Sequence, residues 1–254
     1  METRAVLFDF DGLIVDTETP EYLAWRTVYA RRGLRFPLES WLQNVGRNDR
    51  PFDPLGPFRG GPEGADAVRA EWRAAHAMLE PAYMVPLPGL LPLLRLLREH
   101  GWRAAIGSSS TRGRIIAMLE RLGLAGRFAA VAGGDEVPRA KPAPDVYLLA
   151  AERIAVPPAR CTVLEDSENG VRAAKAAGMR CIAVPSMLTR SLDFSGADLV
   201  VDHLAAVTMD TLCPPAGNGG GRGPAADTRP AGGADAGVAV GMPGGGEAAE
   251  EDRR

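Results

Sequence analysis

The chain has 254 residues, and its last 41 differ in composition from the rest. Residues 214–254 hold 12 of the 30 glycines, 5 of the 21 prolines and no aromatic residue, so they cannot bury enough apolar surface to offset the entropy of ordering their backbone. We expect a disordered tail there. The other 213 residues are enough for one large α/β domain with an inserted subdomain, and too many for a disulfide-stapled miniprotein.

Charge and cysteine usage exclude several classes of protein. With 29 basic and 32 acidic residues the net charge is −3, which gives no electrostatic reason to expect nucleic acid or an anionic membrane as a partner. There is no run of about 18 apolar residues and no signal-peptide pattern. Three cysteines without a CxxC pair suit reduced thiols. We therefore expect a cytoplasmic protein.

Segments typical of strands and helices alternate along residues 5–201. The strand-like segments are residues 5–10, 103–107, 128–132, 161–164, 180–184 and 197–201. Between them, apolar residues at helical spacing predict a helix that opens after Gly89, one around 115–122, one over 145–154 and one that ends at Gly178. This alternation predicts an α/β fold, a doubly wound, Rossmann-like parallel sheet with helices on both faces.

A long insertion separates the first strand from the next helix. A βαβ unit takes about 30 residues, yet more than 70 lie between residue 10 and Pro88. Nine of the fifteen aromatic residues lie between Tyr22 and Tyr83, at helical spacing around Trp25 and Trp72. We predict a helical subdomain over residues 16–85, with an irregular Pro/Gly-rich loop at 51–65, inserted into an α/β domain formed by residues 1–15 and 86–213.

Polar residues follow the predicted strands where each of them ends. The first strand ends with Asp9 and Asp11, Ser108 to Ser110 follow the second, and Glu165 with Asp166 follows the fourth, while Lys141 lies beyond the third. Ligand sites of open parallel sheets lie at this carboxyl edge. Four carboxylates at one edge repel each other unless a divalent cation lies among them, so the pattern predicts a metal site.

Each of these residues also has a purely structural interpretation. A single Asp after a strand is commonly a turn or helix-cap residue, the serines before Thr111 could cap a helix, and Glu165 and Asp166 could form a solvated turn. Lys141 alone would be a surface charge, although it is one of only two lysines beside 27 arginines. Their joint placement favours the functional interpretation.

These residues resemble the four motifs of the haloacid dehalogenase superfamily. The motifs are, in order, residues 9–18 (DFDGLIVDTE), Ser108, residues 141–145 (KPAPD) and residues 164–170 (LEDSENG). The resemblance covers about residues 4–205 and is strongest to the subgroup of sugar-phosphate phosphatases and β-phosphoglucomutases with a helical cap after the first motif.

The resemblance implies a role for each catalytic position. Asp9 would be the nucleophile that forms an aspartyl phosphate, and Asp11 the general acid and then the general base. Ser108 and Ser109 would hold the phosphoryl oxygens with nearby backbone N–H groups, and Lys141 would offset the negative charge of Asp9 and of the phosphate.

The same resemblance implies a Mg²⁺ site and a phosphotransfer reaction. Asp9, Asp166 and the main-chain carbonyl of Asp11 would ligate the ion, with Glu165 assisting directly or through water. The dehalogenases of the superfamily lack the Asp11 carboxylate and need no metal. We therefore expect a Mg²⁺-dependent phosphatase for small phosphorylated metabolites, sugar phosphates above all, that works as a monomer.

Two alternatives stay open from the sequence. A β-phosphoglucomutase-like mutase is one, although Glu21 stands where these mutases have a histidine, and His76, His100 and His203 lie near no motif. The other is an inactive family member that binds a phosphorylated ligand or a partner through its cap. The cap residues that select the substrate are not identified, because Arg47 and Arg50 do not match the register of the mutases' phosphate-contacting arginine; we expect both to be solvated.

Overall fold

Six parallel strands form a single sheet in the computed structural model, which describes residues 4–46, 50–61 and 63–213. The expectations for the tail at 214–254 and for Arg47 fall outside the described residues. The strands are β1 (Ala5–Phe8), β2 (Arg103–Gly107), β3 (Ala130–Ala132), β4 (Cys161–Glu165), β5 (Arg180–Ala183) and β6 (Leu199–Val200). Their order in the sheet is β3-β2-β1-β4-β5-β6, so the predicted doubly wound topology is confirmed.

The strand order reverses between β1 and β4. From β1 the chain proceeds through β2 and β3 on one side and returns to place β4, β5 and β6 on the other. In register, Phe8 pairs with Ile106 of β2 and with Leu164 of β4, so the chain segments that follow these strands emerge together. A ligand site is expected beyond this reversal, outside the carboxyl ends of the strands.

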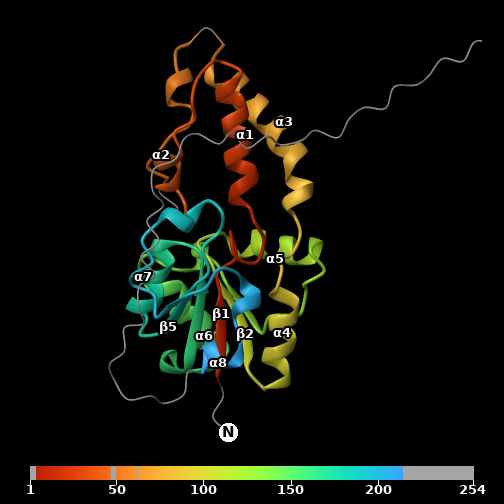
Figure 1. The fold of residues 1–254 in the computed structure, drawn as a ribbon, viewed down its shortest axis with the longest axis vertical. Coiled ribbons are helices and arrows are strands. Elements are labelled where there is room, and N and C mark those ends of the chain that lie inside the picture. The colour runs from red at the N-terminus through yellow and green to blue at the C-terminus, as the bar shows by residue number, and fades with distance from the viewer. Residues whose placement is uncertain (1–3, 47–49, 62, 214–254) are drawn as a thin grey trace, which may run out of the picture. The chain divides into compact units, whose positions relative to one another are not determined.

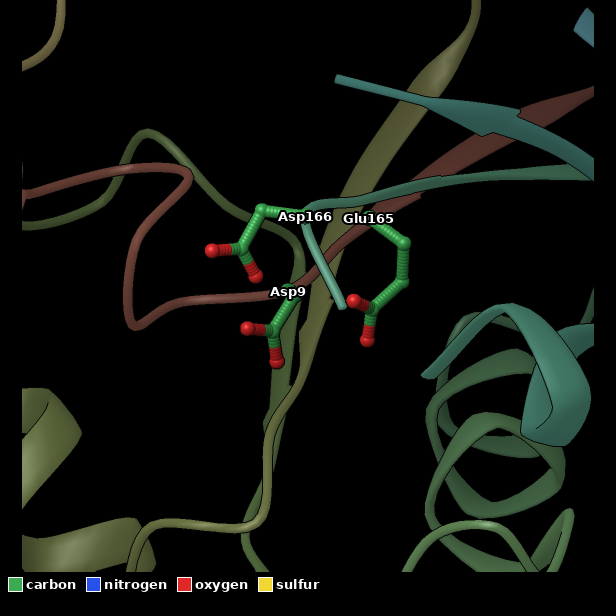
Figure 2. Close-up of side chains that lie close together, drawn as sticks. All are labelled: Asp9, Glu165 and Asp166. Carbon is green, nitrogen blue, oxygen red and sulfur yellow. The ribbon is translucent and has the colours of Figure 1, made fainter. Parts of the chain in front are cut away.

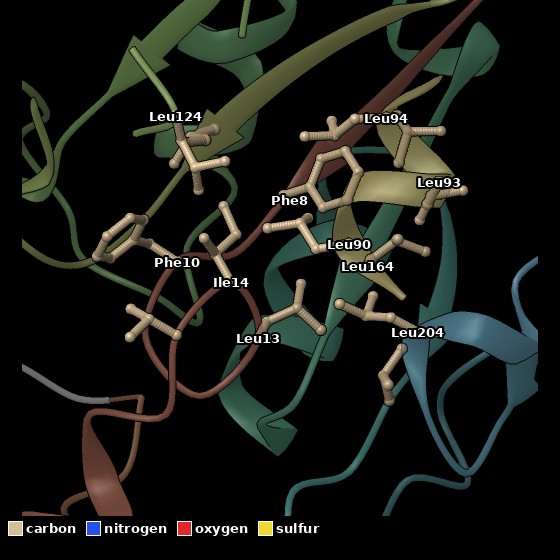
Figure 3. Close-up of a cluster of buried hydrophobic side chains, with 14 of the residues drawn as sticks. Phe8, Phe10, Leu13, Ile14, Leu90, Leu93, Leu94, Leu124, Leu164 and Leu204 are labelled. Carbon is tan, nitrogen blue, oxygen red and sulfur yellow. The ribbon is translucent and has the colours of Figure 1, made fainter. Parts of the chain in front are cut away.

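Helices cover both faces of the sheet (Figure 1). One face is covered by α4 (Leu90–Glu99) and α5 (Arg112–Arg121), and the other by α6 (Asp145–Arg153) and α7 (Glu168–Ala176), while α8 (Met209–Leu212) closes the described part of the chain. Alternate residues of β1 enter the two cores: Phe8 packs with Leu90 and Ile106, and Leu7 packs with Val163 and Tyr147. Figure 3 shows the first of these cores.

The insertion after β1 is helical, as predicted. It contains α1 (Glu18–Ala30), α2 (Leu38–Leu42), a short 3-10 helix η1 (Gly56–Phe58) and α3 (Ala65–Tyr83). The helices pack around aromatic rings: Trp25 stacks on Trp72 with 5.2 Å between ring centroids, and Tyr29 meets Phe36 edge-on at 4.8 Å. This core is separate from the cores of the sheet, which explains why the insertion holds so many of the aromatic residues.

The two chain connections between cap and core run side by side. Val15, on the way into the cap, forms a bridge with Pro86 on the way out, and the amide of Leu87 donates to the carbonyl of Ile14 at 2.9 Å. This paired connection lies beside the predicted boundaries at residues 15–16 and 85–86. It places the cap over the carboxyl ends of the strands (Figure 1).

The cysteines and the helix lengths of the described residues complete the account of the fold. Cys161, Cys181 and Cys213 are free thiols. Among the described residues, no helix combines the length and the apolar character needed to cross a membrane.

Candidate active site

Three buried carboxylates meet where the strand order reverses. Asp9 follows β1, Glu165 is the last residue of β4, and Asp166 comes next. Each offers an oxygen within 4.8 Å of the others, and none is more than 6% exposed (Figure 2). Because parallel strands β1 and β4 are neighbours in register, their carboxyl ends bring together residues that lie more than 150 positions apart in the sequence.

Lys141 is the counter-charge of this cluster. Its ammonium donates to Asp9 Oδ1 at 2.6 Å and to Glu165 Oε1 at 2.7 Å, and its side chain is only 2% exposed. Burial by itself would lower the pKa of Lys141, but the carboxylates of Asp9 and Glu165 raise it above its ordinary value. The lysine therefore stays charged inside the protein.

Tyr147 of α6 completes the support of Lys141 and was not predicted. Its hydroxyl lies 2.9 Å from the Lys141 ammonium and donates to Glu165 Oε1 at 2.7 Å, while the ring is fully buried. The other oxygen of Glu165 accepts from the Ser167 amide and from the Ser167 hydroxyl, both at 2.9 Å. Four protein donors thus occupy the two carboxylate oxygens of Glu165. The carboxylate therefore orients Lys141 and is not available to a molecule in the cavity.

Asp166 has a different environment. One of its carboxylate oxygens, Oδ2, is buried and has no hydrogen-bond partner in the described protein. Burial and the neighbouring carboxylates of Glu165 and Asp9 raise the pKa of Asp166 well above its usual range. Burial likewise raises the pKa of Asp9 to about 7, against the lowering effect of Lys141. Two carboxylates this crowded are poorly compensated without a further cation.

The residues present fit a divalent metal ion on these observations. The unpartnered Asp166 oxygen needs a positive partner, and Asp9 offers its second oxygen beside it. Gly12 leaves the required space: a Cβ at this position would lie 2.1 Å from Asp166 Oδ2, and the residue adopts φ +79°, where glycine is favoured. The buried cluster of Asp9, Glu165 and Asp166 is therefore a candidate metal site, made of the oxygen ligands that hard cations prefer.

Asp11 lies beside the acidic cluster with separate partners. Oδ1 accepts from the Thr17 hydroxyl at 2.8 Å, and Oδ2 accepts from the Ser110 hydroxyl at 2.6 Å and lies 3.4 Å from the Ser108 hydroxyl. Arg114 of α5 also contacts both oxygens, at 2.9 and 3.2 Å. The carboxylate of Asp11 is not a member of the three-carboxylate cluster. This leaves the expectation for Asp11 as a metal ligand unchanged, because that expectation concerns its main-chain carbonyl.

The predicted serines take two different positions. Ser108 is buried directly after β2, and its hydroxyl accepts from the Ser110 amide at 3.1 Å. Ser109 reaches toward the cap, where its hydroxyl lies 3.5 Å from the carbonyl of Gly46. Both serines line the same cavity as Asp9, Asp11 and Lys141.

This cavity of about 880 Å³ lies between the core and the cap. Its size falls in the upper part of the range of roughly 300–1,000 Å³ that is typical of small-molecule sites. The cap contributes Glu18, Glu21, Arg50, Trp72 and His76 to its walls. Burial and the nearby carboxylate of Glu21 raise the pKa of Glu18 to about 8, so the side of the cavity beside α1 is rich in acid groups.

Two cap residues differ from their predicted surroundings. Arg50 is half exposed but not simply solvated: it forms a two-point ion pair with Glu21, at 2.8 and 3.3 Å, and its guanidinium lies over the ring of Trp41. His76 faces the cavity from α3, next to Trp72. Helical spacing of Trp72, His76 and Tyr83 could have revealed this lining face, whereas the pairing of Arg50 with Glu21 has no sequence signal.

Comparison with known proteins shows the family. Residues 3–178 match the model of haloacid dehalogenase-like hydrolases. The chain is 35% identical over 193 residues to the fructose-1-phosphate phosphatase YqaB of Escherichia coli, covering 70% of this chain and 95% of that protein. It is 32% identical over 223 residues to the protein CbbY of Rhodobacter capsulatus, covering 84% and 98%.

Solved structures agree with these relatives. CbbY from Rhodobacter sphaeroides in complex with phosphate superposes with a TM-score of 0.60 at 29% identity, and a mutant of the same protein in complex with xylulose-(1,5)bisphosphate gives 0.60 at 28%. Each covers 80% of this chain and 96% of the solved chain. The chain belongs to the haloacid dehalogenase-like hydrolases, in the subgroup with a helical cap, and its relatives include phosphatases.

Proposed function

We propose that this protein is a Mg²⁺-dependent phosphatase that hydrolyses small phosphomonoesters, sugar phosphates above all, through an aspartyl phosphate. The arrangement of Asp9 carries this proposal. Its carboxylate is buried at the strand reversal, has Lys141 on one oxygen, and is followed two residues later by a second carboxylate, that of Asp11. A nucleophile and an acid–base group are thereby held on one turn of chain.

The reaction would proceed in two transfers. An oxygen of Asp9 forms a bond to phosphorus as the bond between phosphorus and the leaving oxygen breaks, and Asp11 gives that oxygen its proton. Water then attacks the phosphorus of the aspartyl phosphate, Asp11 takes its proton, and the bond to Asp9 breaks to release inorganic phosphate. Lys141 offsets the charge of Asp9 and of the phosphoryl group, and Ser108 positions the phosphoryl oxygens.

The metal would be held by Asp9, Asp166 and the main-chain carbonyl of Asp11. Mg²⁺ bound there supplies positive charge that reduces the repulsion between the Asp9 carboxylate and the incoming phosphate. Glu165 is saturated by Lys141, Tyr147 and Ser167, so we assign it to orienting the lysine and not to holding the ion.

The relatives indicate the substrate class. One is named as a phosphatase for fructose 1-phosphate, and the CbbY structures contain phosphate or a sugar bisphosphate. The cavity between cap and core accommodates molecules of this size. A mutase is less favoured, because Glu21 is engaged by Arg50 rather than free for proton transfer.

The test is phosphate release from a panel of sugar phosphates, with Mg²⁺ or with a chelator. We expect release that needs Mg²⁺ and that Asp9→Asn abolishes. The Asp9→Asn and Asp11→Asn proteins should fold, with unchanged circular dichroism. No release from any substrate would refute the phosphatase, and an isomerised sugar phosphate in place of inorganic phosphate would establish the mutase.

Metal binding has a readout that is independent of turnover. Mg²⁺ should raise the melting temperature of the wild-type protein, because binding to the folded state alone adds stability. Asp166→Asn should remove this increase. In the absence of metal the same variant should melt higher than wild type, because it removes one of three crowded carboxylates. Equal stabilisation of both proteins by Mg²⁺ would contradict the assigned site.

A further inference from the structure

We propose that Arg114 is a latch on Asp11: it holds this carboxylate in a fully hydrogen-bonded resting position until a negative charge on the leaving portion of the substrate takes over the guanidinium. The inference rests on the proposed function, since it concerns the release of the proposed acid and base. It assigns Arg114 as a positioning residue that couples catalysis to the charge of the substrate.

The contacts of Arg114 concentrate on one group. Its Nη1 lies 2.9 Å from Asp11 Oδ1, 3.2 Å from Asp11 Oδ2 and 2.5 Å from the hydroxyl of Ser110. Ser110 in turn donates to Asp11 Oδ2 at 2.6 Å. Ser110 in the loop before α5 and Arg114 in the first turn of that helix therefore hold the carboxylate as one connected unit.

The donors around Asp11 leave it no capacity for a substrate. A carboxylate has about four lone-pair sites. Thr17 and Arg114 occupy Oδ1, while Ser110, Arg114 and, at 3.4 Å, Ser108 surround Oδ2. To exchange a proton with a leaving oxygen or with water, Asp11 must release at least one of these donors. Thr17 and the serines can rotate a hydroxyl, but Arg114 adds a full charge that only another anion can replace.

Arg114 differs from the other cations of the cavity. Lys141 is buried between Asp9 and Glu165, Arg50 pairs with Glu21, and Arg121 pairs with Glu80. In the described residues, the acid that pairs with Arg114 is Asp11, a group of the proposed reaction. The side chain of Arg114 is 44% exposed and lines the cavity, so a bound molecule can reach it.

A substrate with a second anionic group, a carboxylate or a further phosphate, competes with Asp11 for this guanidinium. Arginine binds such groups through two parallel hydrogen bonds, which a mixture of hydroxyls does not replace. A substrate with a neutral leaving portion lacks this means of freeing Asp11. The latch therefore predicts that substrates with a second anionic group are preferred in kcat as well as in binding affinity.

The kinetic test compares matched substrates that differ in the charge of the far end: fructose 1-phosphate against fructose 1,6-bisphosphate, and glycerol 3-phosphate against 3-phosphoglycerate. Wild type should have the higher kcat/KM for the anionic member of each pair. In Arg114→Gln, kcat/KM for the anionic members should fall about tenfold or more. The kcat for the neutral members should rise, because Asp11 is no longer restrained.

Two further variants separate the latch from a general loss of charge. Arg114→Lys keeps the charge without the planar fork and should retain part of the preference. Arg112→Gln removes an exposed arginine two residues away that pairs with Glu136 and does not line the cavity, and it should leave the preference unchanged. The latch is wrong if Arg114→Gln lowers both members of a pair by the same factor, if wild type shows no preference, or if Arg112→Gln has the same effect.

A binding measurement decides the matter without turnover. Calorimetry on the Asp9→Asn protein should give tighter binding of fructose 1,6-bisphosphate than of fructose 1-phosphate, and the added Arg114→Gln change should remove the difference. Absence of turnover in wild type would refute the phosphatase while leaving this arm valid. Equal affinities for the two sugars in Asp9→Asn would refute the role of Arg114 as a reader of charge, whatever the turnover.

Discussion

The hydroxyl of Tyr147 contacts the two charged groups that control Asp9. It bonds both Lys141 and Glu165, and the ring that carries it is fully buried. Burial raises the pKa of Tyr147 well above its usual range, so the phenol keeps its proton and remains a donor to Glu165. Tyr147 does not line the cavity, but by holding Lys141 it fixes the position of the positive charge next to the proposed nucleophile.

At this scale we predict the effect of Tyr147→Phe, which removes one oxygen and keeps the ring. Because a hydrogen bond to a charged group contributes about 1.5–3 kcal/mol, the variant should lose roughly that much free energy of unfolding, and kcat should fall about tenfold as Lys141 loses its orientation. Urea unfolding and phosphate release measure the two effects.

The matched control is Tyr29→Phe in the cap, which removes the hydrogen bond from the Tyr29 hydroxyl to the carbonyl of Pro54 at 2.7 Å. It should lose stability as well, with kcat within about twofold of wild type. An equal loss of kcat in both variants would show that stability alone, and not the support of Lys141, determines the rate.

Among the elements, α7 determines the geometry behind the acidic cluster. Ser167 caps the helix, and its hydroxyl accepts from the amide of Gly170 at 3.1 Å. A Cβ on Gly170 would lie 1.6 Å from Glu165 Oε1, so the first turn of α7 can approach the glutamate only because this position is glycine. The helix therefore sets how deep Glu165, and with it Lys141, is placed.

Gly170→Ala should displace Glu165 and destabilise the protein by roughly 3 kcal/mol or more, because both sides of the clash are buried. Gly113→Ala in α5 is the control: a Cβ there meets nothing within 4 Å, and alanine should stabilise the helix by roughly 0.5–1 kcal/mol. Thermal unfolding of the two variants should give shifts of opposite sign. A stable and fully active Gly170→Ala protein would contradict the assigned packing.

The segment between β3 and α6 is held by Glu136. This glutamate accepts from Arg153 at 2.8 Å through both of its oxygens and from the Gly133 amide at 3.0 Å. The bonds from Arg153, and then the amide, lower the pKa of Glu136 from its ordinary 4.5 to about 2. The contact thus tethers the loop that leads to Lys141.

Because the pKa of Glu136 is lower in the folded state, its contribution to stability is complete above about pH 4.5 and is lost as the pH falls toward about 2. Wild type should melt higher than Glu136→Gln at pH 6, and the difference should shrink steadily below pH 4.5. Glu99→Gln replaces an exposed glutamate of α4 and serves as the control. A difference independent of pH would mean that the carboxylate charge is not the cause.

On the scale of the whole molecule, the sheet and the cap have separate cores and share one cavity. The sheet supplies the proposed reacting groups, and the cap supplies walls of acid, aromatic and arginine side chains. We attribute the chemistry to the core and the choice of substrate to the cavity walls. If Arg114 acts as the proposed latch, a residue of the core also takes part in selecting the substrate.

We expect the chain beyond Cys213 to contribute neither to the chemistry nor to the choice of substrate. Truncation after Cys213 should leave phosphate release and the melting temperature unchanged, because the composition of residues 214–254 cannot form a core. Truncation after Asp202 is the contrasting variant: it also removes Leu204 and Leu212, which are buried against the sheet, and should melt markedly lower. A loss of activity in the first truncation would assign the tail a role.

Much of the fold followed from local pattern. Apolar runs and helical spacing predicted six strands, the helices between them and a helical insertion, because burial imposes its period on the sequence. Four of the strands were predicted too long, since the ladder of β1 stops at Phe8 and that of β6 has only two residues, whereas β2 was predicted with its observed bounds and β4 one residue too short. Apolar character continues past the hydrogen bonds: Phe10 is buried without belonging to β1.

The sequence by itself determined the family, because the motifs that contain Asp9, Asp11, Lys141 and Asp166 resemble, in their order along the chain, those of the haloacid dehalogenase superfamily. Only the tertiary structure decided what each of them contacts. That Glu165 is saturated by Lys141, Tyr147 and Ser167, that Asp166 keeps a bare oxygen, and that Arg114 holds Asp11 depend on distances between segments up to 103 positions apart. Such distances follow from strand order and helix packing, which leave no periodic signal in the chain.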